Sequence, residues 1–312
     1  MGLAAKFFFD STDLAKQTLH RRIVPTDTQF GQQQARWNEL VDYLKPNLQK
    51  TSGVPIRSWL QGSYKFGTQI RPFQKQDEFD IDLGIFFCWA GLPEEGENGP
   101  KAIKDMVQEL LCEFAIESDD VIEVVSPPKE RCCRIRFKDD FHIDVPCYHL
   151  NEAQNSRFLA TENDVWEHSD PKAIYTWFKD LLNDYSRDRT RRLIRYMKTW
   201  ATLKFPEAKG RPSSVLLTVL VAEAVASLKD GLPGSEDEAL DETIRKLTDR
   251  VAKSQVVKNP VDSAENLASR MTREAWKSFS DRLVEFSEIS EQALVAEDEL
   301  LACSVWSRAF EH

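Results

Sequence analysis

Apolar residues recur along the first half of the chain with two different periods. Helical spacing predicts a helix over residues 31–50, and Pro46 is expected to bend that helix or to end it early. Patterns typical of strands follow, with a helix of roughly 101–116 between the first strand and the second. The predicted strands are residues 79–88, 121–126, 131–138 and 141–148. Only two residues separate the last two strands, so we expect an antiparallel hairpin.

From Asp170 onward the pattern is helical, and Pro171 suits the first position of a helix that Asp170 caps. The predicted helices are residues 171–185, 188–204, 212–229, 236–254, 262–269 and 272–302. The fold class that we predict is therefore α+β. Residues 1–168 are expected to form a lobe with a mixed or antiparallel sheet and N-terminal helices, and residues 169–312 a helical lobe, with a cleft between them.

Two aspartates interrupt the apolar strand of residues 79–88. Because side chains in a strand alternate between its faces, Asp80 and Asp82 project side by side from the face opposite the apolar residues. Two carboxylates so close repel each other, which raises their pKa values unless a cation lies between them. Asp144 alternates with apolar residues in the same way on a later strand, so the three carboxylates converge if the two strands are neighbours. Such oxygen ligands suit two ions of Mg²⁺, or of Mn²⁺.

A Gly62-Ser63 turn precedes these aspartates and opens a short predicted helix. Backbone N–H groups and a hydroxyl in such a turn can cradle phosphate oxygens, and glycine lets the phosphate approach closely. Taken singly, each feature is commonplace, since an Asp-x-Asp pair is typical of a surface strand. Their combination in this order predicts a site for Mg²⁺ and a nucleoside triphosphate.

Length, charge and cysteine spacing exclude several classes of protein. The chain has 312 residues, of which 41% are hydrophobic, enough for one large domain or two modest ones. A net charge of −10 argues against a protein that coats nucleic acid or an anionic membrane. The six cysteines show no CxxC spacing, and the longest apolar stretch, residues 215–228, is too short to span a bilayer. We therefore expect a soluble, reduced, cytoplasmic protein without stable nucleic-acid binding.

Five stretches, in this order over roughly residues 61–217, resemble the CD-NTase family of polymerase-beta-type nucleotidyltransferases, above all its bacterial cyclic GMP-AMP synthase branch. They are QGSYKFGTQIRPFQKQDEFDIDLG, CRIRFKDDFHIDVPCY, WEHSDPKAIYTWFKD, RYMKTW and GRPSSVLL. A further stretch, NPVDSAENLASR at 259–270, resembles a region near the end of several members. The resemblance implies a nucleotidyltransferase lobe of residues 1–168, a helical lobe of residues 169–312 that closes over the nucleotide, and an active site in the cleft between them.

The resemblance also implies roles for individual residues. Asp80 and Asp82 are expected to bind both metal ions, while Asp144 binds the catalytic ion and helps to take the proton from the acceptor hydroxyl. Arg134 is similar to an arginine near the acceptor nucleotide that influences the linkage. The residues expected to bind the donor nucleotide, chiefly through its phosphates, are Gln61, Gly62, Ser63, Lys198, Ser213 and Ser214.

The activity that the resemblance implies is the Mg²⁺-dependent condensation of ATP and a second NTP into a cyclic di- or trinucleotide, with release of pyrophosphate. In the family, the product is a second messenger of bacterial anti-phage defence (CBASS), and an effector recognises the product rather than the synthase. The alternative is a linear nucleotidyltransferase of oligoadenylate-synthase or RNA-tailing type, although an RNA-tailing enzyme usually has a basic surface. A catalytically silent nucleotide-binding scaffold is disfavoured, because it has no reason to carry three mutually repelling carboxylates.

Two positions in the predicted helical lobe have an open interpretation. Lys198 lies with Arg191 and Arg195 on one helical face, which is either a solvated basic face or a triphosphate site. Val215 stands where some relatives carry an aromatic residue that stacks on a base, so base selectivity is not predicted.

The roles of two residues near Asp144 are also open. Arg134 either serves the acceptor nucleotide or pairs with an aspartate of the hairpin turn, Asp139 or Asp140. His142 is interpreted as a polar neighbour of Asp144 rather than as a ligand.

Overall fold

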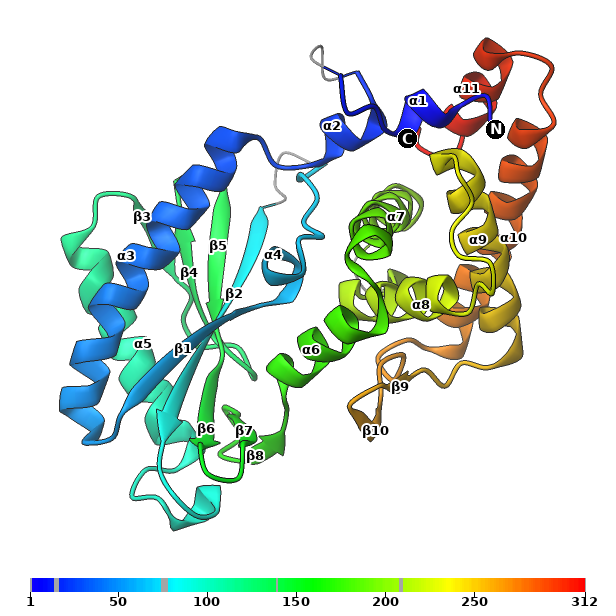
Figure 1. The fold of residues 1–312 in the computed structure, drawn as a ribbon. Coiled ribbons are helices and arrows are strands. Elements are labelled where there is room, and N and C mark those ends of the chain that lie inside the picture. Colours follow the sequence, from blue (N-terminus) through cyan, green and yellow to red (C-terminus); the bar gives the residue numbers. More distant parts are fainter. Residues whose placement is uncertain (1, 14–16, 74–77, 139, 208–209, 312) are drawn as a thin grey trace. The chain divides into compact units, whose positions relative to one another are not determined.

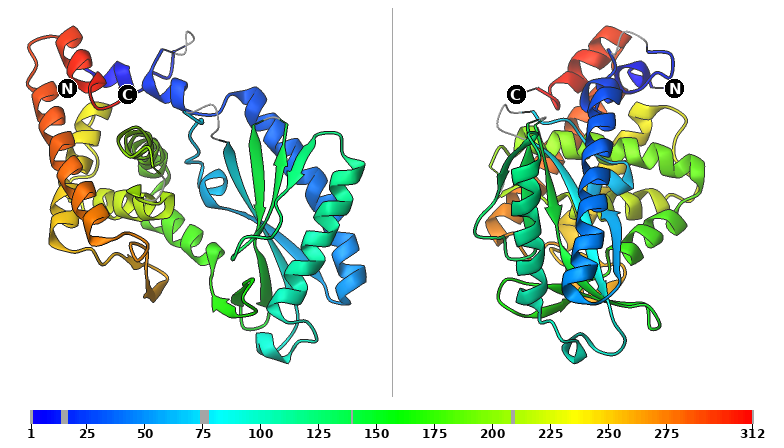
Figure 2. Two further views of the ribbon diagram at one scale, coloured as in Figure 1. Left: turned by 180° about the vertical axis from the view of Figure 1, so that it is seen from behind. Right: turned by 90° about the vertical axis from the view of Figure 1, so that its left-hand side faces the viewer.

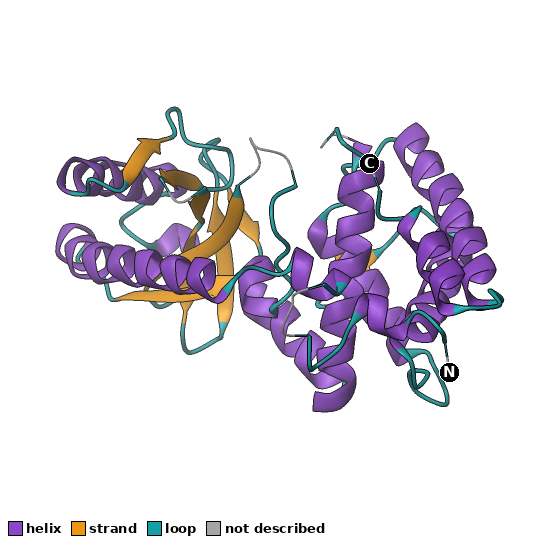
Figure 3. Cartoon of the chain, turned by 90° about the horizontal axis from the view of Figure 1, so that it is seen from above, coloured by secondary structure: helices purple, strands orange, loops and turns teal. Residues whose placement is uncertain are grey.

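The computed structural model describes residues 2–13, 17–73, 78–138, 140–207 and 210–311. The chain divides into two compact units, one of Pro25–Ala173 and the other of Met1–Val24 together with Ile174–His312 (Figure 1). The first unit is a sheet with helices packed on it, and the second is nearly all helix (Figure 3). This confirms the predicted α+β class.

The sheet of the first unit has eight strands in the described part of the chain: β1 (Ile56–Gln61), β2 (Phe79–Cys88), β3 (Val121–Val124), β4 (Cys133–Phe137), β5 (Phe141–Val145), β6 (Cys147–Asn151), β7 (Ser156–Ala160) and β8 (Trp166–His168). Their order is β3-β4-β5-β2-β6-β7-β8, with β1 also paired to β2. Strand β2 is antiparallel to β1 and parallel to β5 and β6, so the sheet is mixed. The predicted hairpin is confirmed, because β4 and β5 are antiparallel neighbours.

Two long helices, α3 (Asp27–Ser52) and α5 (Pro100–Glu117), cover one face of this sheet (Figures 1 and 2). Apolar residues of both helices form one core with the β2 residues Ile81, Leu83 and Ile85, each at most 1% exposed. Because strand side chains alternate, Asp80 and Asp82 face away from this core.

Helix α3 runs through Pro46, so the expectation that the proline ends it early is wrong. The helix continues to Ser52 and ends at Gly53, whose φ of +72° is left-handed. A proline inside a helix costs about 3 kcal/mol. Burial of Leu44 and Leu48, both 0% exposed, offsets this, since each contributes about 1.5–3 kcal/mol.

The second unit contains, within the described ranges, α1 (Ala5–Phe8), α2 (Leu19–Ile23), most of α6 (Pro171–Leu181), α7 (Asp184–Lys204), α8 (Ser214–Ala226), α9 (Glu236–Lys253), α10 (Arg273–Leu294) and α11 (Glu299–Ser307). Phe8 shows why the N-terminal segment up to Val24 belongs to this unit rather than to the predicted lobe of residues 1–168. Its ring packs edge-on against Tyr196 at 5.2 Å and Trp306 at 4.9 Å. None of the described helices is long and apolar enough to cross a membrane.

Two predictions in the C-terminal region are wrong. Instead of a helix over 262–269, β10 (Asp262–Asn266) pairs with β9 (Lys258–Asn259), and Pro260 between them favours a turn. The single helix over 272–302 is two helices, because the Asp298 side chain accepts a hydrogen bond from the Leu301 N–H and begins α11.

Candidate active site

Four side chains form a row across four neighbouring strands, on the sheet face away from α3 and α5. The register pairs Arg134 of β4 with Asp144 of β5. It pairs Asp144 with Asp82 of β2, and Asp82 with Gln61 of β1. Residues paired across neighbouring strands have side chains on the same face, a few ångströms apart. This first row brings together two of the predicted metal ligands, so β2 and β5 are neighbours as the sequence required.

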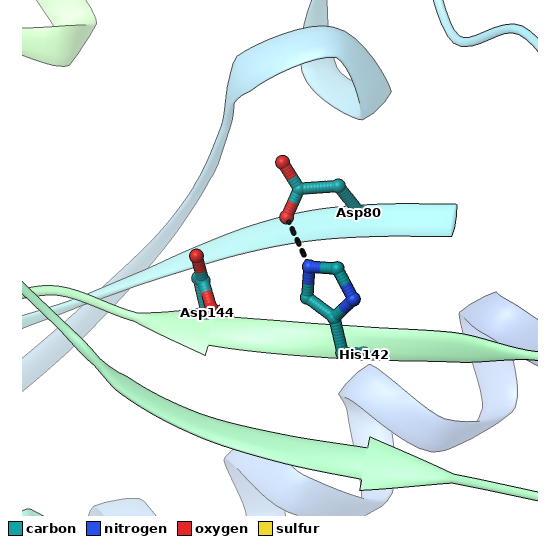
Figure 4. A group of neighbouring side chains, drawn as sticks. All are labelled: Asp80, His142 and Asp144. Atoms are coloured by element: carbon teal, nitrogen blue, oxygen red, sulfur yellow. Dashed lines mark ion pairs between the residues drawn. The ribbon is translucent and has the colours of Figure 1, made fainter. Parts of the chain in front are cut away.

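A second row lies two residues away along β4, β5 and β2, and it extends onto β3 instead of β1. The register pairs Glu123 of β3 with Arg136 of β4, and Arg136 with His142 of β5. His142 is in turn paired with Asp80 of β2. Asp80, His142 and Asp144 each offer one ligand atom, and these atoms all lie within 4.8 Å of one another (Figure 4). A metal ion could therefore bind between the two rows.

Cations hold the carboxylate of Asp144. Arg134 donates through Nε to one oxygen of Asp144, and through Nη2 to the other at 2.7 Å. Lys129 adds a second positive charge, with its Nζ 3.7 Å from Oδ2 of Asp144. The partner of Arg134 is thus a site aspartate and not the turn residue Asp140, while Asp139 lies outside the described residues.

The same positive charges act on Asp80, whose side chain is 52% exposed. Partial loss of water around the Asp80 carboxyl would by itself raise its pKa, but His142 lowers the pKa through a contact of 3.0 Å between Nε2 and Oδ1. Arg134 and Lys129 lower this pKa further, so that it lies below its usual range. The repulsion expected between the aspartates is therefore offset by neighbouring cations of the protein.

The Gly62-Ser63 turn opens the short helix α4 (Gly62–Phe66), as predicted. Gly62 has a φ of +57°, and a Cβ placed on it would lie 1.8 Å from Oδ2 of Asp82. Only glycine meets both conditions without strain. The turn predicted to bind phosphate and the Asp-x-Asp pair are therefore in direct contact.

Gln61, at the end of the first row, is 7% exposed. Its Oε1 accepts a hydrogen bond from the Tyr148 hydroxyl at 3.1 Å. Its Nε2 lies against Gly84, where an added Cβ would come within 2.0 Å of it. The Gln61 side chain is thus fixed on the sheet, and its contact with a phosphate stays a prediction.

The second unit carries the other residues predicted to bind nucleotide. Lys198 of α7 is only 7% exposed, which contradicts the solvated-face alternative for this residue. Burial also lowers the pKa of Arg195, on the same helix, to about 10. Ser213 caps α8 by accepting a hydrogen bond from the Leu216 N–H at 3.3 Å, and Ser214 is its exposed first residue. Their contact with a triphosphate stays a prediction.

Two charged residues near these aspartates, Glu78 and Lys129, were not predicted from the sequence. Glu78 lies 2.9 Å from Nδ1 of His142, and alternation counted back from Asp80 could have placed it on this face. No comparable pattern in the sequence indicated that Lys129 lies near the aspartates. Its loop is held by the fully buried Lys104, whose Nζ donates to the Lys129 carbonyl at 2.6 Å.

Comparison with known proteins relates this site to one family. Residues 56–148 match the family described as "Cyclic GMP-AMP synthase DncV-like, nucleotidyltransferase domain". The matched range contains every residue of both rows and the Gly-Ser turn.

Curated relatives extend the similarity beyond that range. A cyclic GMP-AMP synthase of Escherichia albertii is 27% identical, over 100% of this chain and 67% of its own length. A c-di-GMP synthase of Roseivirga ehrenbergii is 24% identical, over 77% of this chain and 68% of its own length. A cyclic GMP-AMP synthase of Vibrio cholerae is 26% identical, over 56% of this chain and 49% of its own length. The matches thus cover about half to two thirds of these relatives.

Solved structures share the fold. The Vibrio cholerae di-nucleotide cyclase (DncV) in complex with GTP superposes with a TM-score of 0.84 at 20% identity, over 100% of this chain and 96% of that one. A DncV structure with the linear intermediate 5′ pppA(3′,5′)pG gives a TM-score of 0.78, also at 20% identity, over 100% of this chain and 96% of that one. The fold is therefore that of a DncV-like nucleotidyltransferase.

Proposed function

We propose that this chain, which belongs to the CD-NTase family of nucleotidyltransferases, condenses nucleoside triphosphates into a cyclic di- or trinucleotide with release of pyrophosphate. Relatives that are named cyclic GMP-AMP synthase and c-di-GMP synthase support this activity. The observation that carries the proposal is the convergence of Asp80, Asp82 and Asp144 on one sheet face, beside the Gly62-Ser63 turn.

The residues at this site fit divalent metal ions. Their carboxylates are hard oxygen ligands, and the ligand atoms of Asp80 and Asp144 lie within 4.8 Å of each other. In the proposal, Asp80 and Asp82 hold two ions and Asp144 shares one of them. The ions are Mg²⁺, with Mn²⁺ as the substitute. When bound, such a pair activates an attacking hydroxyl and stabilises a leaving oxygen.

Asp144 and Arg134 are proposed to act on the acceptor nucleotide. The acceptor hydroxyl oxygen forms a bond to the donor's α-phosphorus, the bond to pyrophosphate breaks, and the hydroxyl proton passes to Asp144. Arg134 places a permanent charge next to Asp144 and has a planar fork that can grip a phosphate or a base edge.

The donor nucleotide is proposed to place its triphosphate at the Gly62-Ser63 turn. The left-handed Gly62 presents no side chain there, and Ser63 offers a hydroxyl and a backbone N–H. The other residues assigned to donor binding are Gln61, Lys198, Ser213 and Ser214.

We further propose that ATP and a second NTP are the substrates, and that the product is a second messenger of anti-phage defence that an effector recognises. A net charge of −10 supports the absence of stable nucleic-acid binding. All six cysteines are free thiols, which supports a reducing, cytoplasmic setting.

Incubation of the purified protein with Mg²⁺ and each pair of NTPs tests the activity. The products are separated by chromatography, identified by mass spectrometry and digested with phosphatase. We expect a product that resists phosphatase, because a cyclic oligonucleotide has no terminal phosphate. Products that are linear and phosphatase-sensitive throughout would replace the cyclase with the oligoadenylate-like alternative.

A further inference from the structure

We propose that His142 is a positioning residue that fixes the Asp80 carboxylate for metal binding. The inference rests on the proposed function and adds to it a residue outside the three aspartates. His142 lies between two acids. Its Nδ1 is 2.9 Å from Oε2 of Glu78. Its Nε2 is 3.0 Å from Oδ1 of Asp80, and Figure 4 shows this ion pair as a dashed line.

The imidazole is itself held in place. His142 is 7% exposed. Glu78, which faces its Nδ1, accepts hydrogen bonds from Nε of Arg136 at 2.9 Å and from Nη2 at 2.5 Å. Arg136 also donates to Glu123 at 3.0 Å. Polar contacts thus run without a gap from Arg136 to Glu78, from Glu78 to His142, and from His142 to Asp80.

Asp80 is the carboxylate that depends on such a support. Its side chain is 52% exposed, so packing does little to select its rotamer. Asp144 is held by Arg134, and Asp82 lies against Gly62. In the same way, the contact with His142 orients the carboxylate of Asp80. Outer contacts of this kind typically change metal affinity 10- to 100-fold.

The geometry favours positioning over direct ligation of the metal by His142. A ring nitrogen within 4.8 Å of ligand atoms on Asp80 and Asp144 could reach an ion. Both ring nitrogens, however, face carboxylate oxygens of Glu78 and Asp80. Nε2, the nitrogen nearer to the two aspartates, lies 3.0 Å from Oδ1 of Asp80, so an ion bound to Nε2 would have to displace that carboxylate oxygen.

Mn²⁺ binding to the metal-free chain, followed by electron paramagnetic resonance, tests this inference. We expect the dissociation constant to rise about 10- to 100-fold in His142→Ala and by about three- to tenfold in Glu78→Gln, which keeps its shape. Glu152→Gln is the matched control, because Glu152 is 55% exposed and pairs with Arg57, outside this chain of contacts. Its dissociation constant should stay within about twofold of the wild-type value. Product formation by His142→Ala should recover at saturating Mn²⁺, which a general defect in folding would prevent.

Wild-type Mn²⁺ affinity in both His142→Ala and Glu78→Gln would overturn the inference. So would a nitrogen hyperfine coupling to bound Mn²⁺ that disappears in His142→Ala, because it would make His142 a ligand. Failure of the proposed function has a different signature, since the wild-type chain would then bind no Mn²⁺ or form no product.

Discussion

Gly62 and Asp82 come from different elements, α4 and β2, yet a Cβ on Gly62 would force the Asp82 carboxylate to move. A phosphate that approaches the turn closely requires a glycine here. The structure adds a second requirement, because the carboxylate of Asp82 fills the space that a Cβ would occupy. The Gly-Ser turn and the first row therefore depend on each other through one contact.

Gly62→Ala should abolish product formation and lower the free energy of unfolding by at least about 1–2 kcal/mol, the cost of a left-handed residue with a Cβ. The matched control is Gly31→Ala in α3, where an added Cβ meets nothing within 4 Å. That variant should gain about 0.5–1 kcal/mol and keep its activity. Urea unfolding measures both values, and equal stability and activity in the two variants would contradict the contact with Asp82.

The elements of the site differ in how well the sequence predicts them. Strands β2 and β5 could be predicted because alternation is a local property of the chain. The register between strands is not local, so the pairing of Asp80 with His142 could not be foreseen and His142 was interpreted only as a neighbour of Asp144. Strand β1 was missed, and with it the place of Gln61 in the first row.

Helix α3 carries a proline, Pro46, in its interior. Pro46 is exposed, so it contributes little packing, but it removes one backbone hydrogen bond from the helix. Pro46→Ala should therefore raise the free energy of unfolding by about 1–3 kcal/mol. In contrast, Leu44→Ala, on the buried face two residues away, should lower it by about 2–5 kcal/mol. A loss of stability in Pro46→Ala, measured by the same urea titration, would mean that the proline has a packing role.

The whole molecule consists of two units of different composition, and the change from strand to helical patterns at Asp170 lies close to where the first unit ends, at Ala173. That the N-terminal residues belong with the helical unit could not be predicted. Phe8 finds its partners, Tyr196 and Trp306, far along the chain, and no local pattern encodes such a contact.

Lys198, on α7 of the second unit, is proposed to bind the donor triphosphate, and its substitution tests this assignment. Lys198→Ala should raise the KM for NTP about 10- to 150-fold, because a charge-assisted contact to the triphosphate contributes about 1.5–3 kcal/mol. Lys204→Ala is the control on the same helix. Its Nζ donates to the carbonyls of Arg308 and Glu311, at 3.0 and 3.1 Å, so the KM should not change. An unchanged KM in Lys198→Ala would make Lys198 a structural residue of α7.

Product formation by the double variant Asp80→Asn with Asp82→Asn decides whether the aspartates of β2 are required for catalysis. Asparagine keeps the shape of each side chain but removes the charge that would hold the metal ions. With Mg²⁺ and the NTP pair that serves the wild type, we predict no cyclic product from the double variant and a full yield from Asp119→Asn, an exposed control in the same unit. Substantial synthesis by the double variant would contradict the assignment of the two aspartates to metal binding.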